Sequence, residues 1–132
     1  MAIFRWLSRA PATPLILLSN REPYVHQRGP DGEVLVSRPA GGLTSALQPV
    51  MAAAGGTWIA WGHGSADFDV TDIGDTIGLP PEAPSFRLRR MRLSAEEVVG
   101  YYLETANRAL WPLCHAQLPR FVYDAASWLA YR

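Results

Sequence analysis

A helix-like segment between two short apolar runs is the feature that most restricts how this chain can fold. The first run, Leu15–Leu18, is continuously apolar, which is typical of a strand buried on both faces of a parallel sheet. The second run, Thr57–Trp61, is equally short. Between the two runs, apolar residues recur at the spacing of one helix face: Leu43, Leu47, Val50 and Met51. A strand, a helix and a strand in this order predict a parallel βαβ unit with a right-handed crossover.

Glycine pairs mark both ends of the predicted helix. Gly41 and Gly42 precede its first apolar residue, and Gly55 and Gly56 follow its last residue. A proline inside a helix lacks an amide donor and clashes with the preceding turn, so Pro49 is expected to bend or shorten this one.

The rest of the chain predicts a hairpin, a third strand and two more helices. Gly62–Pro84 is rich in glycine, proline and acidic residues and is expected to be mostly loop. A capping box of Ser94 and Glu97 predicts a helix that Trp111 and Pro112 interrupt. The other expected elements are hairpin strands over Tyr24–Arg28 and Glu33–Arg38, a strand over Phe86–Met91, and a helix over Tyr123–Tyr131. The sequence therefore predicts an α/β fold with an inserted β-hairpin.

The composition limits the classes of partner. The chain has 132 residues, of which 48% are hydrophobic, so it can bury a core of its own. Its 12 basic and 12 acidic residues leave no basic excess that would indicate nucleic acid or an anionic membrane. A single cysteine, Cys114, fits a reducing cytoplasm. Residues 1–14 are expected to be a flexible leader, and residues 15–132 are expected to form one incomplete domain.

Arg21 and the glycine pair at 41–42 predict a phosphate or sugar-phosphate site. Arg21 follows the first strand, and ligands of open α/β sheets bind beyond the carboxyl ends of strands. Gly41 and Gly42 begin the first helix, whose free amides and dipole favour an anion. Two simpler interpretations remain open: a glycine pair that serves only the turn, and an arginine that is only solvated.

Tyr102 and Trp111 form a second candidate pair. They are nine residues apart, so on a regular helix their side chains would point about 180° apart. They can share a pocket only if the helix breaks near Trp111, which Pro112 makes plausible. The alternative is that both rings belong to the core.

No metal or cofactor motif is complete. His26, His63 and His115 lack the spacing of metal ligands. The segment Gly62–Asp67 follows a strand as a dinucleotide-binding loop would, but Asp67 occupies the position of the third glycine. We therefore expect neither a metal nor a cofactor.

Six short motifs, taken together in their order, resemble one family. They are Leu17–Arg21; Gly41–Leu43 with Ser45–Leu47; Gly56–Gly62; Tyr101-Tyr102 with Asn107; Leu110–Leu113 with His115; and Trp128 with Tyr131. No single motif is specific, but their order and spacing resemble the N-terminal part of the trehalose-6-phosphate synthase family of retaining glycosyltransferases.

The resemblance implies a GT-B fold, in which this chain supplies part of the first of two Rossmann-like lobes. It also implies transfer of glucose from UDP-glucose to glucose 6-phosphate, without a metal, in trehalose biosynthesis. Arg21, Tyr102 and Trp111 would contact the acceptor, and Gly41 and Gly42 would approach the donor. The leaving diphosphate would help to deprotonate the acceptor hydroxyl, while the enzyme positions the reactants and stabilises charge.

Departures from the family pattern leave the acceptor open. Leu103–Ala106 replaces a more polar and aromatic stretch, and Cys114 and Ala116 flank His115 where aromatic residues are common in the family. A glycosyltransferase using another phosphorylated acceptor, such as glycerol 3-phosphate, and a non-catalytic sugar-phosphate-binding module are the alternatives. The catalytic residues are expected beyond residue 132, so the isolated chain is expected to be inactive.

Overall fold

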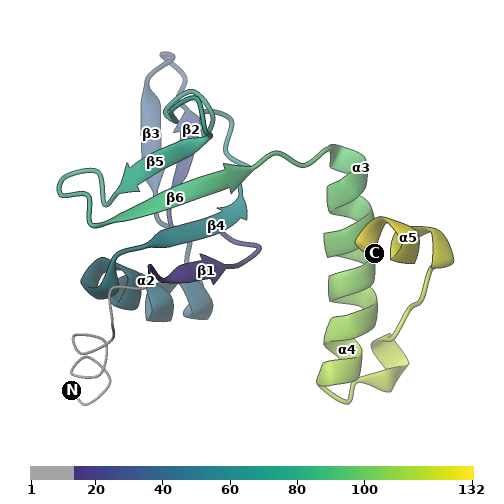
Figure 1. The fold of residues 1–132 in the computed structure, drawn as a ribbon. Helices are drawn as coiled ribbons and strands as arrows, with labels where there is room; N and C mark the ends of the chain where they lie inside the picture. Colours follow the sequence, from purple (N-terminus) through teal and green to yellow (C-terminus); the bar gives the residue numbers. More distant parts are fainter. Residues whose placement is uncertain (1–13) are drawn as a thin grey trace. The chain divides into compact units, whose positions relative to one another are not determined.

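The computed structural model describes residues 14–132, which fall into two compact units (Figure 1). The first unit ends at Arg92, and the second comprises Leu93–Arg132. Residues 1–13 of the predicted leader lie outside the described residues. Within residues 14–132, none of the helices is long and apolar enough to cross a membrane.

The first unit is built on a four-stranded sheet. In spatial order its strands are β1 (Ile16–Leu18), β4 (Thr57–Trp61), β6 (Phe86–Met91) and β5 (Thr76–Leu79). Both β1 and β6 run parallel to β4, whereas β5 runs antiparallel to β6. The parallel pairing that the sequence predicts for the two apolar runs is therefore confirmed.

The segment Gly62–Pro84 is mostly loop, as predicted, but it also contains a strand that the sequence did not predict. It contains β5, a strand at the edge of the sheet that pairs with β6 along its whole length. Its sequence, Thr-Ile-Gly-Leu, is short and interrupted by glycine, so it carries no clear alternation of its own. Long-range pairing with β6 determines this strand.

A single helix, α2 (Gly42–Ala54), connects the hairpin to β4. Gly55 and Gly56, with φ of 72° and 100°, end it as predicted. At Gly56 a side chain would also collide with the backbone of Leu15. The expected shortening at Pro49 is wrong, because α2 continues through Pro49 to Ala54. Pro49 and Ser45 are both exposed, so water can reach the carbonyl that this proline leaves without a donor.

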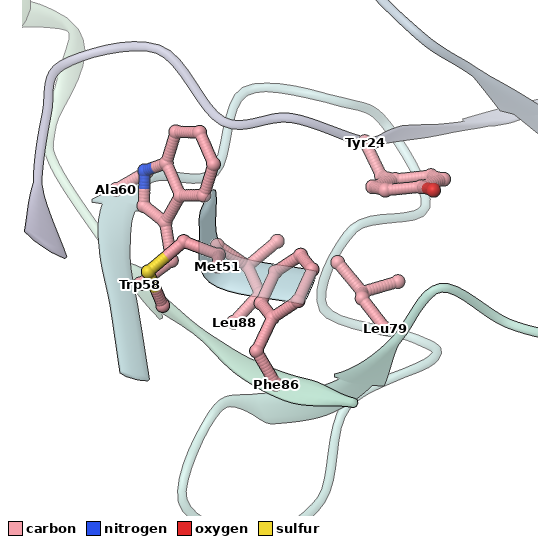
Figure 2. Packing of buried hydrophobic residues seen from close by; sticks show 7 residues of the cluster. All are labelled: Tyr24, Met51, Trp58, Ala60, Leu79, Phe86 and Leu88. Carbon is pink, nitrogen blue, oxygen red and sulfur yellow. The ribbon is translucent and has the colours of Figure 1, made fainter. Parts of the chain in front are cut away.

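The hydrophobic core lies between α2 and one face of the sheet (Figure 2). Met51 of α2 packs with Trp58 and Leu88, which come from the central strands β4 and β6. The rings of Trp58 and Phe86 are 6.2 Å apart. The whole cluster consists of Tyr24, Met51, Trp58, Ala60, Leu79, Phe86 and Leu88.

The opposite face of β1 is not covered within this unit. The continuous apolar run predicted burial on both faces, and this expectation is wrong for the unit as described. Leu17 packs against the core, but Ile16 and Leu18 are 67% and 76% exposed. The reason is that alternate side chains point away from α2, to the face of the sheet on which Arg87 and Arg89 of the central strand β6 are exposed as well.

The inserted hairpin is confirmed. Strands β2 (Val25–Arg28) and β3 (Val34–Ser37) pair antiparallel as a separate two-stranded sheet (Figure 1). The predicted turn closes through bonds from the Gly29 amide to the Glu33 carbonyl, 2.8 Å, and from the Gly32 amide to the Gly29 carbonyl, 3.1 Å.

The second unit is helical. Its elements are α3 (Ala95–Glu97), the π-helical segment η1 (Val98–Leu110), α4 (Trp111–Cys114), the short 3-10 helix η2 (Leu118–Arg120) and α5 (Ala125–Tyr131). The capping box is confirmed, because Ser94 and Glu97 exchange both side chain to backbone hydrogen bonds. Asp124 caps α5 by accepting a hydrogen bond from the Ser127 amide.

The predicted interruption at Trp111 and Pro112 is wrong. Trp111 has helical angles, φ −62° and ψ −47°, and α4 directly continues η1. Pro112 has no amide to donate, yet the helix continues through it. The carbonyl of Arg108 near this point accepts a hydrogen bond from the amide of Val122, at 2.9 Å.

We predict that Leu88→Ala lowers the free energy of unfolding by about 2–5 kcal/mol, because it leaves a cavity among fully buried side chains. The matched control is Arg89→Ala, the neighbouring exposed position on β6, which should change it by less than about 0.5 kcal/mol. Chemical denaturation followed by tryptophan fluorescence measures both. Equal effects of the two variants would contradict this account of the core.

Candidate functional site

Arg21 lies just beyond β1 with its backbone held and its side chain exposed. The Ser19 hydroxyl donates to the carbonyl of Arg21 at 2.7 Å, and the indole N–H of Trp58 donates to the same hydroxyl oxygen at 2.8 Å. Among residues 14–132, no carboxylate pairs with the Arg21 guanidinium. The core tryptophan therefore fixes the position from which a free cation extends.

The glycine pair begins α2 as predicted. Gly41 has extended geometry, with φ of −174°, and no side chain caps the helix. A β-carbon on Gly42 would meet nothing within 4 Å, so the folded chain itself does not require glycine there. Because α2 leads back into β4 through only Gly55 and Gly56, its N-terminus lies at the edge where β1 and β4 end.

A hollow of about 430 Å³ lies between the segment that follows β1 and the first turns of α2. It is bordered by Pro23, which follows Arg21 closely in the chain, and by Thr44 and Ser45 from the first turn of α2. The side chain of Gln48 donates to the Tyr24 hydroxyl at 2.8 Å and joins the same two segments. The structure thus brings the segment that carries Arg21 beside the start of α2.

Directly behind Arg21 is a cluster that the sequence did not predict. We call it the charge cluster, and its members are Glu22, His26, His63, Asp67 and Arg90. The side chains of Glu22, Asp67 and Arg90 are 0% exposed. Buried charges are costly unless they are paired and hydrogen-bonded, so the geometry of the cluster decides whether it is stable.

Arg90 satisfies that requirement at the centre of the charge cluster. Its Nε donates to Glu22 Oε2 at 2.7 Å, and its Nη2 lies 3.0 Å from Asp67 Oδ1. The guanidinium also donates to the carbonyls of Asp67 and Tyr24, at 2.6 and 3.1 Å. Its Nη2 lies 2.7 Å from Nδ1 of His26. One cation therefore binds two carboxylates, two carbonyls and an imidazole.

The two carboxylates of the charge cluster have pKa values that are shifted in opposite directions. Burial raises the pKa of Glu22, and the contacts with His63 and Arg90 only partly oppose this effect. Burial also disfavours ionised Asp67, but hydrogen bonds from Glu22 and from the amides of His26 and Gly64 hold the pKa of Asp67 below its usual value. Glu22 therefore takes up a proton at a higher pH than Asp67 does.

The two histidines of the charge cluster differ in the same way. Burial, together with the charge of Arg90, lowers the pKa of His26 and so favours its neutral imidazole. The hydrogen bond to Glu22 raises the pKa of His63, while partial burial and the charge of Arg21 oppose this rise. His63 Nδ1 is 3.3 Å from Glu22 Oε1, and its side chain is 40% exposed. His63 is the member of the cluster that reaches solvent as a potential cation.

Three members of the charge cluster could in principle hold a metal ion. Ligand atoms of Glu22, His63 and Asp67 lie within 4.8 Å of one another. The guanidinium of Arg90, however, already contacts both carboxylates. A divalent cation would meet this positive charge at short range, so the arrangement does not fit a metal site.

Tyr102 and Trp111 belong to the second unit. The Tyr102 ring is half-buried and lies 6.0 Å from the Tyr101 ring, whereas Trp111 is 47% exposed and stacks on His115 at 3.8 Å. A hollow of about 400 Å³ beside Trp111 is lined by Asn107, Arg108, Pro112, Gln117 and Arg120. Tyr102 does not line this hollow. The shared pocket of the two rings therefore remains a prediction.

The sequence contained a signal for the charge cluster. In the alternating strand Phe86–Met91, Arg90 has the same parity as Phe86 and Leu88, which indicates an inward position. An inward arginine requires buried acceptors, and Glu22 and Asp67 each lie shortly after a strand. Asp67 does not fit a dinucleotide-binding loop. Its carboxylate instead accepts hydrogen bonds from the backbone amides of His26 and Gly64, at 2.7 and 2.6 Å.

Comparison with known proteins finds relatives over most of the chain, although no family model matches. The trehalose-6-phosphate synthases of Mycobacterium ulcerans (strain Agy99) and Mycobacterium marinum are each 35% identical over 117 residues, which cover 88% of this chain and 22% of the relative. The chain therefore spans less than a quarter of the length of these relatives.

Solved structures agree with the sequence comparison. The trehalose-6-phosphate synthase OtsA matches with a TM-score of 0.62 at 26% identity, covering 90% of this chain and 23% of OtsA. An α,α-trehalose-phosphate synthase from Burkholderia xenovorans, solved with glucose-6-phosphate, has the same TM-score at 24% identity, covering 90% and 23%. The predicted α/β class is confirmed, and the fold is similar to part of a GT-B glycosyltransferase.

We predict that Arg90→Met destabilises the first unit by about 3–5 kcal/mol, because it leaves buried carboxylates without their cation. Arg87→Met, on the same strand, is the matched control. It removes only the exposed pair with Asp72 and should cost less than about 1 kcal/mol. Urea denaturation compares the two. Similar costs would show that the charge cluster contributes no more than a surface pair.

We also predict that His63 titrates above the usual histidine pKa and that Glu22→Gln brings this pKa down, because the variant removes the main cause of the shift. Protonated His63 then stabilises the folded state. This contribution is complete below the unfolded-state pKa, about 6.5, and disappears as the pH rises through the higher folded-state pKa. NMR titration of the imidazole resonances measures the shift, and an unchanged pKa in the variant would contradict it.

Proposed function

We propose, from the homology to trehalose-6-phosphate synthases over 88% of this chain, that it is the acceptor-binding N-terminal part of such an enzyme. The reaction would transfer glucose from UDP-glucose to glucose 6-phosphate and form trehalose 6-phosphate. The two units together would form part of the first lobe. A second lobe, which the chain as printed does not contain, would supply most contacts to the donor. We expect the enzyme to act in the cytoplasm.

The geometry of Arg21 is the observation that carries this proposal. Its backbone is tied through Ser19 to the buried Trp58, while its guanidinium is exposed and free of carboxylates among the described residues. A planar guanidinium can hold two oxygens of a phosphate at once. Because its origin is rigid, Arg21 would orient the whole acceptor through the phosphate at one end.

The start of α2 would serve the donor. Its first amides are not capped by a side chain, and the space beside Gly42 is open. Free amides and the helix dipole both favour negative charge at this end. The diphosphate of UDP-glucose carries such charge, and more of it develops there as the glycosidic bond breaks. Gly41 and Gly42 would therefore support the leaving group.

Tyr102 and Trp111 would contact the sugar ring of the acceptor. The ring of Trp111 is 47% exposed, although the described hollow beside it does not include Tyr102. Their roles rest on the motifs Tyr101-Tyr102 and Leu110–Leu113. With only this part of the enzyme present, we expect acceptor binding without glucose transfer.

We predict that the chain binds glucose 6-phosphate and that Arg21→Ala weakens binding roughly 10- to 100-fold, the value of a lost charged hydrogen bond. Arg89→Ala, which removes another exposed arginine, should bind as the wild type does. Calorimetric titration measures the affinities, with glucose as the unphosphorylated control. Equal binding by Arg21→Ala and the wild type would contradict the role of Arg21.

A further inference from the structure

Arg21 and His63 occupy neighbouring positions at the same edge of the sheet. Strands β1 and β4 are parallel, with Leu18 opposite Ile59, and the Ser19 amide extends the pairing by donating to the Ile59 carbonyl at 3.1 Å. Arg21 and His63 follow these paired residues by three and four positions. The two cations are close enough for the charge of Arg21 to oppose protonation of His63.

The imidazole of His63 is held from one side and open on the other. Its Nδ1 lies 3.3 Å from Glu22 Oε1, and its backbone amide donates to the same oxygen at 3.4 Å. The Trp61 ring lies 5.3 Å away. Since Nδ1 faces the fully buried Glu22 and the His63 side chain is 40% exposed, Nε2 is the ring nitrogen left for a ligand.

We propose that His63 is a second phosphate-binding residue, which acts with Arg21 as a clamp on the phosphate of the acceptor. This inference rests on the function proposed for Arg21 and deepens it by assigning the other half of the phosphate site. The ligand class is a phosphate monoester. Arg21 would take two of its oxygens, and the Nε2–H of His63 would donate to a third.

The charge cluster favours the protonated, positively charged form of His63 in this clamp. The groups that face His63 are Glu22 and Asp67, which favour the imidazolium, and Arg21, which opposes it; Arg90 lies behind Glu22. A bound phosphate dianion between Arg21 and His63 would replace their mutual repulsion by two attractions. Its binding should therefore raise the pKa of His63 further.

Two other roles for His63 fit the structure less well. A purely structural histidine would be enclosed, as His26 is at 4% side-chain exposure, whereas His63 is 40% exposed. A metal ligand would have to share Glu22 and Asp67 with the guanidinium of Arg90. An exposed, tethered imidazole, near an arginine that no carboxylate of residues 14–132 pairs with, fits an anion best.

The test is phosphate binding by His63→Gln. Calorimetry with the whole chain measures the affinity for glucose 6-phosphate and for inorganic phosphate at pH values from about 5.5 to 8.5, which bracket the ordinary histidine pKa. We expect His63→Gln to weaken both about tenfold at the acid end, the value of one charged hydrogen bond. The ratio of wild-type to variant affinity should approach one as the pH rises through the pKa of His63. Taking the ratio at each pH cancels the ionisation of the phosphate itself.

Further variants separate the possible outcomes. His63→Lys should recover part of the affinity, and Arg89→Ala should leave it unchanged. If Arg21→Ala loses binding while His63→Gln does not, the clamp is overturned and the proposed function stands. If the wild type binds neither ligand, both are overturned. A loss in His63→Gln that stays constant over the pH range would also overturn the clamp, because it would indicate a structural effect rather than a charge.

Discussion

The guanidinium of Arg90 is the constraint on which the rest of the first unit depends. It bonds to the carboxylate of Glu22 and the carbonyl of Tyr24 from one segment, and to Asp67 from another, while its own backbone is part of a central strand. These segments have no regular pairing with one another. A planar cation with several fixed donors, together with the hydrogen bonds from the His26 amide to Asp67 and from the Ala66 amide to the His26 carbonyl, therefore joins segments that no sheet connects.

The position of this cation matters for function because Glu22 directly follows Arg21. The backbone at Arg21 is fixed on one side by Ser19 and Trp58 and on the other by the buried side chain of Glu22. The exposed guanidinium of Arg21 thus extends from a backbone whose position is fixed. The same carboxylate also tethers His63, so one buried acid connects the interior cation with two cations at the surface.

The sequence predicted the elements whose signals are local. The βαβ unit follows from apolar runs and glycine pairs, and the capping box at Ser94 follows from two residues three apart. Arg21 and the glycine pair were singled out from their place after a strand and before a helix, and the structure brings their segments together, while their roles at a phosphate stay predictions. What the sequence missed depends on distant partners: Glu22 and Arg90 are 68 residues apart, and the amide of Val122 donates to the carbonyl of Arg108 in the preceding helix. The apolar run of β1 likewise does not indicate that the face of the sheet carrying Ile16 and Leu18 is left uncovered within the first unit.

A charged interior needs a reason, because well-packed apolar side chains usually stabilise a fold at least as well as a buried ion pair does. Met or Leu at position 90 would continue the alternation of Phe86 and Leu88, and with apolar residues also in place of Glu22 and Asp67 the core would be uniformly apolar. Such a core would contain no carboxylate like Glu22 to raise the pKa of His63 at the surface. Burying the charge cluster has a desolvation cost, but its hydrogen bonds fix the directions of the polar side chains. Glu22 adjoins Arg21 in the chain and contacts His63, so this directional order would serve the phosphate site that we propose in addition to stability.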